Sequence, residues 1–281
     1  MTKNLMQRIF TTVIGIPLVV CLLVLLPQFN FLGFSILAFI AALLGTRELE
    51  RLLTKHNTYF SFLPPFLIVF VYLQLLFDIE LPLSNFYLVF LLLIFFSKEI
   101  FLGEKDNFKS VISAIGNSLI MVFYPSFLIT YVIRILALNS INLPKNAALY
   151  FLFMLILVFS NDIFAYVWGV TLGKNSKKLI KVSPNKSLAG FIGGHVSSVV
   201  ISLVMVYLFY PEIGFFMGTI MALFISFTAN VGDLVESTLK RSASVKDSGN
   251  IIPGRGGVLD SIDSIIFSTP FFYLFLILTS L

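Results

Sequence analysis

Long apolar runs are the feature that most constrains how this chain can fold. Of its 281 residues, 58% are hydrophobic and 12% are charged, whereas a soluble domain has roughly 25% charged residues. Inside a bilayer, backbone polar groups must be paired within the protein, so runs of this length form helices. We therefore predict an all-α fold, a polytopic membrane helical bundle of about nine transmembrane helices, at residues 9–27, 31–46, 60–77, 83–97, 112–138, 148–172, 190–210, 213–232 and 262–280.

The chain is expected to form a single integral membrane domain over residues 1–281. Residues 1–140 have the character of scaffold helices, and residues 148–281 contain most of the polar chemistry, with polar loops at 173–190 and 233–263. Cys21 is the only cysteine and lies within the first predicted span. A disulfide framework and a thiolate metal site are therefore excluded.

Lysine and arginine are distributed unevenly between the loops of the nine-span bundle. All but two of the 19 basic residues fall on the N-terminal side, and the exceptions are Arg134 and Lys145. Because positively charged loops stay cytoplasmic, we predict a multi-pass protein of the cell inner (plasma) membrane with its N-terminus and polar loops in the cytoplasm. The net charge of +5 then reflects topology and contact with anionic membrane lipids, and not binding of nucleic acid.

The polar stretch from Asp233 to Asp263 holds five of the fourteen acidic residues. It begins with four polar residues at helical spacing, which share one face if the preceding apolar helix continues through them: Asp233, Glu236, Ser237 and Lys240. A glycine-rich loop follows, and then Asp260 and Asp263, one helical turn apart. Carboxylates, cations and glycines within one loop suit phosphate groups and a divalent metal.

Structural explanations compete with this interpretation. Glu236 and Lys240 have the spacing of an ordinary helix ion pair, and Asp260 with Asp263 could cap the last span at its positive end. Residues 47–51, Arg-Glu-Leu-Glu-Arg, are expected to form an interfacial charged turn with its own ion pairing.

Two further polar features lie before that stretch. Asp162 falls near the middle of an apolar run, where an isolated carboxylate is costly, so it must face a cavity or a partner. The alternative is a packing contact between helices through Asn161. The loop 173–190 contains five lysines, of which Lys186 precedes a helix and is a plausible phosphate ligand. The other four could simply lie on anionic headgroups: Lys174, Lys177, Lys178 and Lys181.

These motifs resemble the phosphatidate cytidylyltransferase (CDP-diacylglycerol synthase) family. The resemblance is carried by Ser237-x-Leu239-Lys240-Arg241, Lys246-Asp247-x-Gly249, and Pro253-x-x-Gly256-Gly257-x-x-Asp260-x-x-Asp263. It is extended by Asn161-Asp162-x-x-Ala165-Tyr166 with Gly169, and by Ser183-Pro184-Asn185-Lys186-Ser187. It is strong from about residue 155 onward and general before that.

The resemblance implies that the chain transfers CMP from CTP to phosphatidate and releases pyrophosphate. It implies Mg²⁺ as cofactor, with Asp233 and Asp260 as metal ligands. The catalytic group would comprise Asp233, Lys240, Asp247 and Asp263. Substrate phosphates would be bound in a cavity lined by Lys186, Arg241, Lys246, Arg255 and Asp162. A homodimer is left open.

Three positions depart from the family pattern. Ala189 stands where an acid is usual, Arg255 where the family has His, and Ser261 where it has Arg. We hypothesise that Arg255 replaces the phosphate contact of the missing Arg. An inactive relative or one of altered specificity therefore stays open. A transporter is a weaker alternative, because the polar chemistry gathers in the last third of the chain and not in two related halves.

Overall fold

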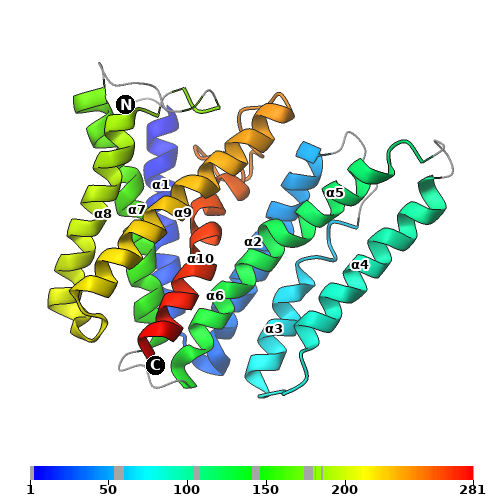
Figure 1. The fold of residues 1–281 in the computed structure, drawn as a ribbon, viewed down its shortest axis with the longest axis horizontal. Coiled ribbons are helices and arrows are strands. Elements are labelled where there is room, and N and C mark those ends of the chain that lie inside the picture. Colours follow the sequence, from blue (N-terminus) through cyan, green and yellow to red (C-terminus); the bar gives the residue numbers. More distant parts are fainter. Residues whose placement is uncertain are drawn as a thin grey trace. The chain divides into compact units, whose positions relative to one another are not determined.

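The computed structural model describes residues 3–53, 60–103, 108–140, 146–173, 180, 182–184 and 186–280. These residues form helices joined by turns and loops, and Ile252 and Gly256 form an isolated bridge within the last of these loops. The predicted all-α fold is confirmed. The α-helices shown in Figure 1 are α1 (Lys3–Val20), α2 (Gln28–Leu53), α3 (Phe66–Leu76), α4 (Leu83–Leu102), α5 (Val111–Met121), α6 (Leu128–Leu136), α7 (Ala147–Leu172), α8 (Leu188–Phe209), α9 (Phe215–Ser242) and α10 (Leu259–Ser280).

Shorter helical pieces join some of these helices. They are η1 (Cys21–Leu25), η3 (Val122–Phe127), η4 (Ala137–Ser140) and η6 (Pro211–Ile213). Because η3 continues α5 into α6, these three elements make one long apolar run.

Seven helical stretches in the described part of the chain are long and apolar enough to cross a membrane. They are Gln28–Leu53, Leu83–Leu102, Val111–Leu136, Ala147–Leu172, Leu188–Phe209, Phe215–Ser242 and Leu259–Thr279. The other two predicted spans correspond to shorter apolar helices, Phe10–Leu25 and Phe66–Leu76. In the second case Pro64 and Pro65 precede the helix, and α3 begins only at Phe66, since a helix seldom runs through such a pair.

The chain divides into two compact units. Unit 1 comprises Met1–Ala137 and Ser242–Ser261, and unit 2 comprises Leu138–Arg241 and Ile262–Leu281. The first boundary falls close to the division expected from the sequence. The glycine-rich segment 242–261, however, groups with the N-terminal helices, although the sequence associates it with the C-terminal motifs.

The core of unit 1 contains apolar side chains from three elements. Leu67 on α3 packs with Leu91 and Phe95 on α4 and with Val122 on η3, and all four are at most 2% exposed. This contact packs α3, α4 and η3 together within unit 1.

In unit 2, α7 and α8 pack closely because glycines of α8 face α7. A Cβ at Gly194 would lie 2.8 Å from Oδ1 of Asn161 and 3.0 Å from Cβ of Ala165. A larger residue would force the helices apart. The same close approach brings the start of α8 beside the polar part of α7.

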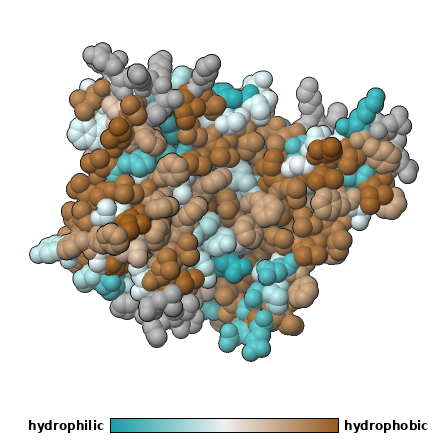
Figure 2. Space-filling view, in the orientation of Figure 1, coloured by the Kyte–Doolittle hydropathy of each residue, from teal (hydrophilic) through white to brown (hydrophobic). Residues whose placement is uncertain are grey.

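The outward face of α8 is apolar. Ile192, Val196, Val200 and Val204 follow one another at four-residue spacing, and each is at least 50% exposed. Figure 2 shows apolar side chains over most of the visible surface. Exposed apolar stripes of this kind suit contact with lipid.

Candidate active site

An ion pair in unit 2 joins two of the predicted site residues. The Lys186 ammonium, in the turn before α8, contacts Oδ2 of Asp233 on α9, and both side chains are 33% exposed. The turn is held by Ser187, whose Oγ accepts a hydrogen bond from the backbone N–H of Gly190 at 3.1 Å. The side chain of Ser187 is thus the N-cap of α8 and places Lys186 at that helix terminus.

Asp162 on α7 belongs to the same cluster. It is accessible at the surface of α7, and its carboxylate interacts electrostatically with both Lys186 and Asp233. Asn161 donates from Nδ2 to Oδ1 of Asp162 at 3.5 Å, and its own Oδ1 accepts from Nδ2 of Asn230 at 3.4 Å. The helix–helix contact through Asn161 therefore exists, but it accompanies the clustering of Asp162 and does not replace it.

Asn230 is a polar residue that the sequence analysis did not single out. It is 4% exposed and lies one helical turn before Asp233 on α9. The sequence signal that could have identified Asn230 was its polar side chain in an apolar helix, three residues before Asp233. Its role is to connect α9 to α7 beside the charged groups.

Asp263 completes the acidic side of the cluster. It is 6% exposed, its Oδ1 accepts from the backbone N–H of Ser264 at 2.6 Å, and its carboxylate interacts with those of Asp233 and Asp162. Gly232 allows this arrangement, because a Cβ there would lie 2.6 Å from the carbonyl oxygen of Asp263. Only glycine lets α9 and α10 approach this closely.

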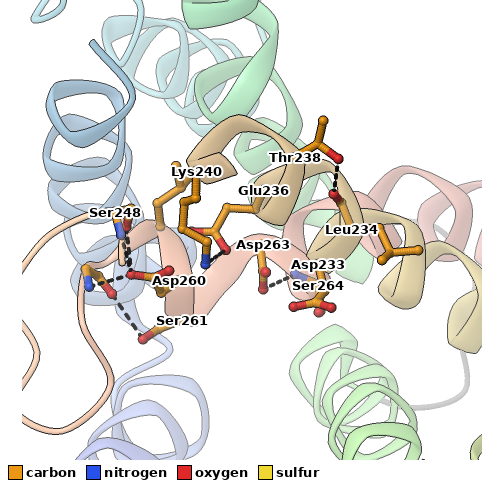
Figure 3. Close-up of polar contacts among 12 residues, drawn as sticks. Asp233, Leu234, Glu236, Thr238, Lys240, Ser248, Asp260, Ser261, Asp263 and Ser264 are labelled. Atoms are coloured by element: carbon orange, nitrogen blue, oxygen red, sulfur yellow. Dashed lines mark hydrogen bonds and ion pairs between the residues drawn. The ribbon is translucent and has the colours of Figure 1, made fainter. Parts of the chain in front are cut away.

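Glu236 and Lys240 form the helix ion pair that their spacing predicts. Lys240 Nζ lies 2.6 Å from Oε2 of Glu236, which is 1% exposed (Figure 3). The side chain of Glu236 also hydrogen-bonds with Asp263. Lys240 therefore has a structural partner, and its contribution to phosphate binding stays a prediction.

The charges of unit 2 suit a divalent cation. Three carboxylates, those of Asp162, Asp233 and Asp263, interact with one another, and Lys186 supplies one balancing charge. Carboxylate oxygens are ligands that Mg²⁺ prefers. Within the residues described, no three His, Cys, Asp or Glu side chains are arranged as a ready-made metal site. The donor chemistry therefore fits the ion, and the cluster is not a preformed cage.

In unit 1, Asp260 organises the glycine-rich loop. Its Oδ2 accepts three hydrogen bonds, from Ser248 N at 2.8 Å, Ser248 Oγ at 2.9 Å and Gly257 N at 2.8 Å. Gly256 has φ of +108°, which glycine adopts readily, and its carbonyl accepts from Ile252 N at 2.8 Å. These three donors belong to the loop before α10, so Asp260 holds that loop together, and its roles as a helix cap and as a metal ligand stay predictions.

The turn at residues 47–51 differs from the expectation. Arg47 and Arg51 are exposed, but Glu48 and Glu50 are buried, at 1% and 6% exposure. The segment is part of helix α2, as a helical turn requires, but the expectation of an exposed charged turn is wrong for its two acids, which face the interior of unit 1. No pattern within the sequence distinguished these acids from ordinary partners of the flanking arginines.

The remaining predicted residues lie on the exposed side of their segments. Arg241 lies in the last turn of α9, and Lys246, Asp247 and Arg255 belong to the loop. Arg255 Nη2 donates to Oγ1 of Thr12 on α1 at 3.1 Å. The polybasic group lies outside the described residues: Lys174, Lys177, Lys178 and Lys181.

Together these features define a polytopic all-α membrane protein with an acidic cluster, a lysine at a helix N-terminus and a glycine-rich loop. Comparison with known families gives the class a name. The model of the cytidylyltransferase family matches residues 6–279, and the chain belongs to that family.

Individual relatives agree with this assignment. Phosphatidate cytidylyltransferase of Bacillus subtilis is 41% identical over 139 residues, covering 50% of this chain and 51% of the relative. The enzyme of the same name from Staphylococcus aureus strain COL is 41% identical over 130 residues, 46% of this chain and 49% of the relative. The uncharacterized protein YnbB of Escherichia coli is 36% identical over 201 residues, 72% of this chain and 63% of the relative. The chain thus spans about half to two thirds of the relatives it matches.

Proposed function

We propose that the protein transfers the cytidylyl group of CTP to phosphatidate, forming CDP-diacylglycerol and pyrophosphate. The observation that supports this most is the cluster of Lys186, Asp233, Asp162 and Asp263, because it unites three separate motifs from the sequence. Membership of the cytidylyltransferase family and the names of the bacterial relatives support the same reaction.

In this reaction a phosphate oxygen of phosphatidate attacks the α-phosphorus of CTP. The bond from the α-phosphorus to the bridging oxygen of the β-phosphate breaks, and pyrophosphate leaves with that electron pair. Such a transfer requires mainly that two anions be positioned and that developing charge be neutralised. Asp233 would help to hold Mg²⁺, which when bound would supply positive charge to offset the negative charge of the reacting phosphates.

The residues of unit 2 would exchange partners during this step. The Lys186 ammonium, paired with Asp233 in this structure, would turn to the incoming triphosphate. Asp233 would then be released for the cation, with Asp162 and Asp263 beside it. In this proposal Asp260 is the second metal ligand, and Lys240, Arg241, Lys246, Asp247 and Arg255 support the phosphates and the loop.

The test is release of pyrophosphate by the purified protein in detergent micelles containing phosphatidate. We expect release only when CTP, phosphatidate and Mg²⁺ are all present, and CDP-diacylglycerol should form in equal amount. Diacylglycerol without its phosphate is the matched control, because it keeps the acyl chains and lacks the attacking oxygen. Failure to release pyrophosphate from the complete mixture would contradict the proposal.

An altered lipid acceptor is the second candidate. Two observations favour it: the departures from the family pattern at Ala189, Arg255 and Ser261, and a relative without an assigned activity that matches 72% of the chain. The same assay with other phosphomonoester lipids decides between phosphatidate and a different lipid acceptor. Pyrophosphate release that depends on such a lipid and not on phosphatidate would replace the first proposal.

A further inference from the structure

Glu48 is a buried acid in the half of the chain where the sequence indicated no functional residue. It lies on α2 and is 1% exposed. Its carboxylate nevertheless contacts the glycine-rich loop of unit 1. Oε1 accepts from the backbone N–H of Val258 at 3.0 Å, and Oε2 accepts from the N–H of Leu259 at 2.9 Å and from Oγ of Ser248 at 3.2 Å.

These donors explain how a carboxylate is tolerated in the interior. Among the residues that the structure describes, Glu48 forms no ion pair with a basic side chain. Its charge is instead compensated by three hydrogen bonds and by the positive end of α10, which begins at Leu259. Val258, just before the helix, has no polar side chain with which to cap it. Glu48, on a distant helix, thus accepts from backbone N–H groups at the start of α10, as an N-cap side chain does.

The loop leaves room for this carboxylate and for little else. A Cβ at Gly249 would lie 2.9 Å from Cδ of Glu48, and a Cβ at Gly257 would lie 2.7 Å from the same atom. The carboxylate is therefore enclosed between two glycines of the loop. Movement of Glu48 must be accompanied by movement of the loop backbone.

The same residues connect Glu48 to Asp260. The hydroxyl oxygen of Ser248 lies 3.2 Å from Oε2 of Glu48 and 2.9 Å from Oδ2 of Asp260. The single hydroxyl hydrogen of Ser248 is therefore shared between the two carboxylates. Gly257 donates its N–H to Asp260, while the next two N–H groups, of Val258 and Leu259, are bound by Glu48. The two acids hold consecutive parts of one backbone segment.

We propose that Glu48 is a positioning residue for the cytidylyl transfer reaction. It fixes residues 257–259 and thereby the direction in which α10 starts and in which Asp260 points. This inference rests on the proposed function, because the loop is assigned to catalysis only there. The hydrogen bonds themselves can be tested without any substrate.

The first experiment is Glu48→Gln, which keeps the size of the side chain but replaces an acceptor oxygen by an NH₂ donor. In either orientation of the amide, a donor then faces a backbone N–H. Hydrogen exchange measured by mass spectrometry on the substrate-free protein should show faster exchange of the peptide spanning 246–261, by about tenfold, the scale of losing one hydrogen bond to a charged group. Exchange at the wild-type rate would overturn the proposal.

The second experiment measures activity. In Glu48→Gln we expect the KM for CTP and the half-activating Mg²⁺ concentration each to rise about tenfold. In Glu48→Asp, which keeps the charge but is one methylene shorter, both constants should lie between those of the wild type and those of Glu48→Gln. A purely structural role would lower the amount of folded protein and leave both constants of the remaining fraction unchanged, and that outcome would overturn the proposal.

Glu50→Gln is the matched control. Glu50 is a second buried acid on α2, 6% exposed, and interacts electrostatically with Lys98 on α4. In Glu50→Gln we expect the exchange rate of peptide 246–261, the KM for CTP and the half-activating Mg²⁺ concentration to stay within about twofold of the wild-type values. Equal effects of the two substitutions would refute a specific role of Glu48. If the wild type releases no pyrophosphate, the proposed function fails, but the exchange experiment still decides whether Glu48 holds the loop.

Discussion

At the scale of single residues, the cluster around Lys186 makes a direct prediction about its carboxylates. Asp233→Asn and Asp263→Asn keep the shape of the side chains and remove their charge. Each should reduce turnover by at least about a hundredfold, the scale of removing one preorganised charge-stabilising group. The measurement is CTP-dependent pyrophosphate release at equal amounts of folded protein.

Thr238→Ala is the control for these substitutions. Thr238 lies on the exposed side of α9, and its hydroxyl donates to the carbonyl of Leu234 in the same helix at 2.8 Å (Figure 3). The turnover of the Thr238→Ala variant should match that of the wild type. Near-normal rates in both aspartate variants would indicate that Asp233 and Asp263 serve the packing of α9 against α10 and not catalysis.

Arg255 is the residue at which the departure from the family pattern can be tested. If it replaces the missing phosphate contact, Arg255→Ala should reduce activity severely, because the forked donors of arginine bind phosphate in pairs. Arg255→His should also weaken activity. Arg255→His combined with Ser261→Arg should restore it. The measurement is kcat/KM for CTP.

Thr12→Val separates phosphate binding from a structural role. It removes the hydroxyl that accepts from Arg255 and leaves the arginine in place. The hypothesis requires this variant to remain active. If Thr12→Val were as impaired as Arg255→Ala, the contact with α1 would be the function of Arg255.

At the scale of elements, glycines determine how closely the helices of unit 2 approach. Gly232→Ala would place a methyl group 2.6 Å from the carbonyl oxygen of Asp263 and 3.0 Å from Cβ of Phe267. Because neither backbone nor Cβ can rotate away, we expect destabilisation of about 1–3 kcal/mol. The apparent Tm in detergent should fall by several degrees.

Gly116→Ala is the matched control on α5. Apart from its chain neighbours and the backbone of its own helix, no atom of the described residues lies within 4 Å of a Cβ at that position, and alanine is the better helix former by about 0.5–1 kcal/mol. The apparent Tm should therefore stay constant or rise slightly. A fall equal to that of Gly232→Ala would show that close approach of α9 and α10 is not the cause.

At the scale of the whole molecule, the distribution of basic residues predicts the orientation in the membrane. Single cysteines at two exposed positions, Asn250 in the glycine-rich loop and Leu81 between α3 and α4, test it in a Cys21→Ala background. A membrane-impermeant thiol reagent should label Asn250→Cys only from the cytoplasmic face and Leu81→Cys only from the opposite face. Labelling with the reverse pattern would place the loop away from CTP.

The amino-acid sequence by itself determined the class of fold and most of the helices. The run predicted at 148–172 is α7, Ala147–Leu172, because apolar length is a local property and the bilayer permits few alternatives to a helix. It also indicated Asp162, Lys186, Asp233 and Asp263, since charged or polar residues beside long apolar runs require a reason to be there.

Tertiary structure alone decided what those residues contact. The burial of Glu48 and its bonds to Val258 and Leu259 join positions more than 200 residues apart, and no local spacing encodes a contact of that kind. The pairing of Asp233 with Lys186, and the approach of α10 that Gly232 permits, likewise depend on which faces of separate helices meet. Periodicity specifies the face that a helix buries, but the partner of that face is chosen by packing of the complete unit.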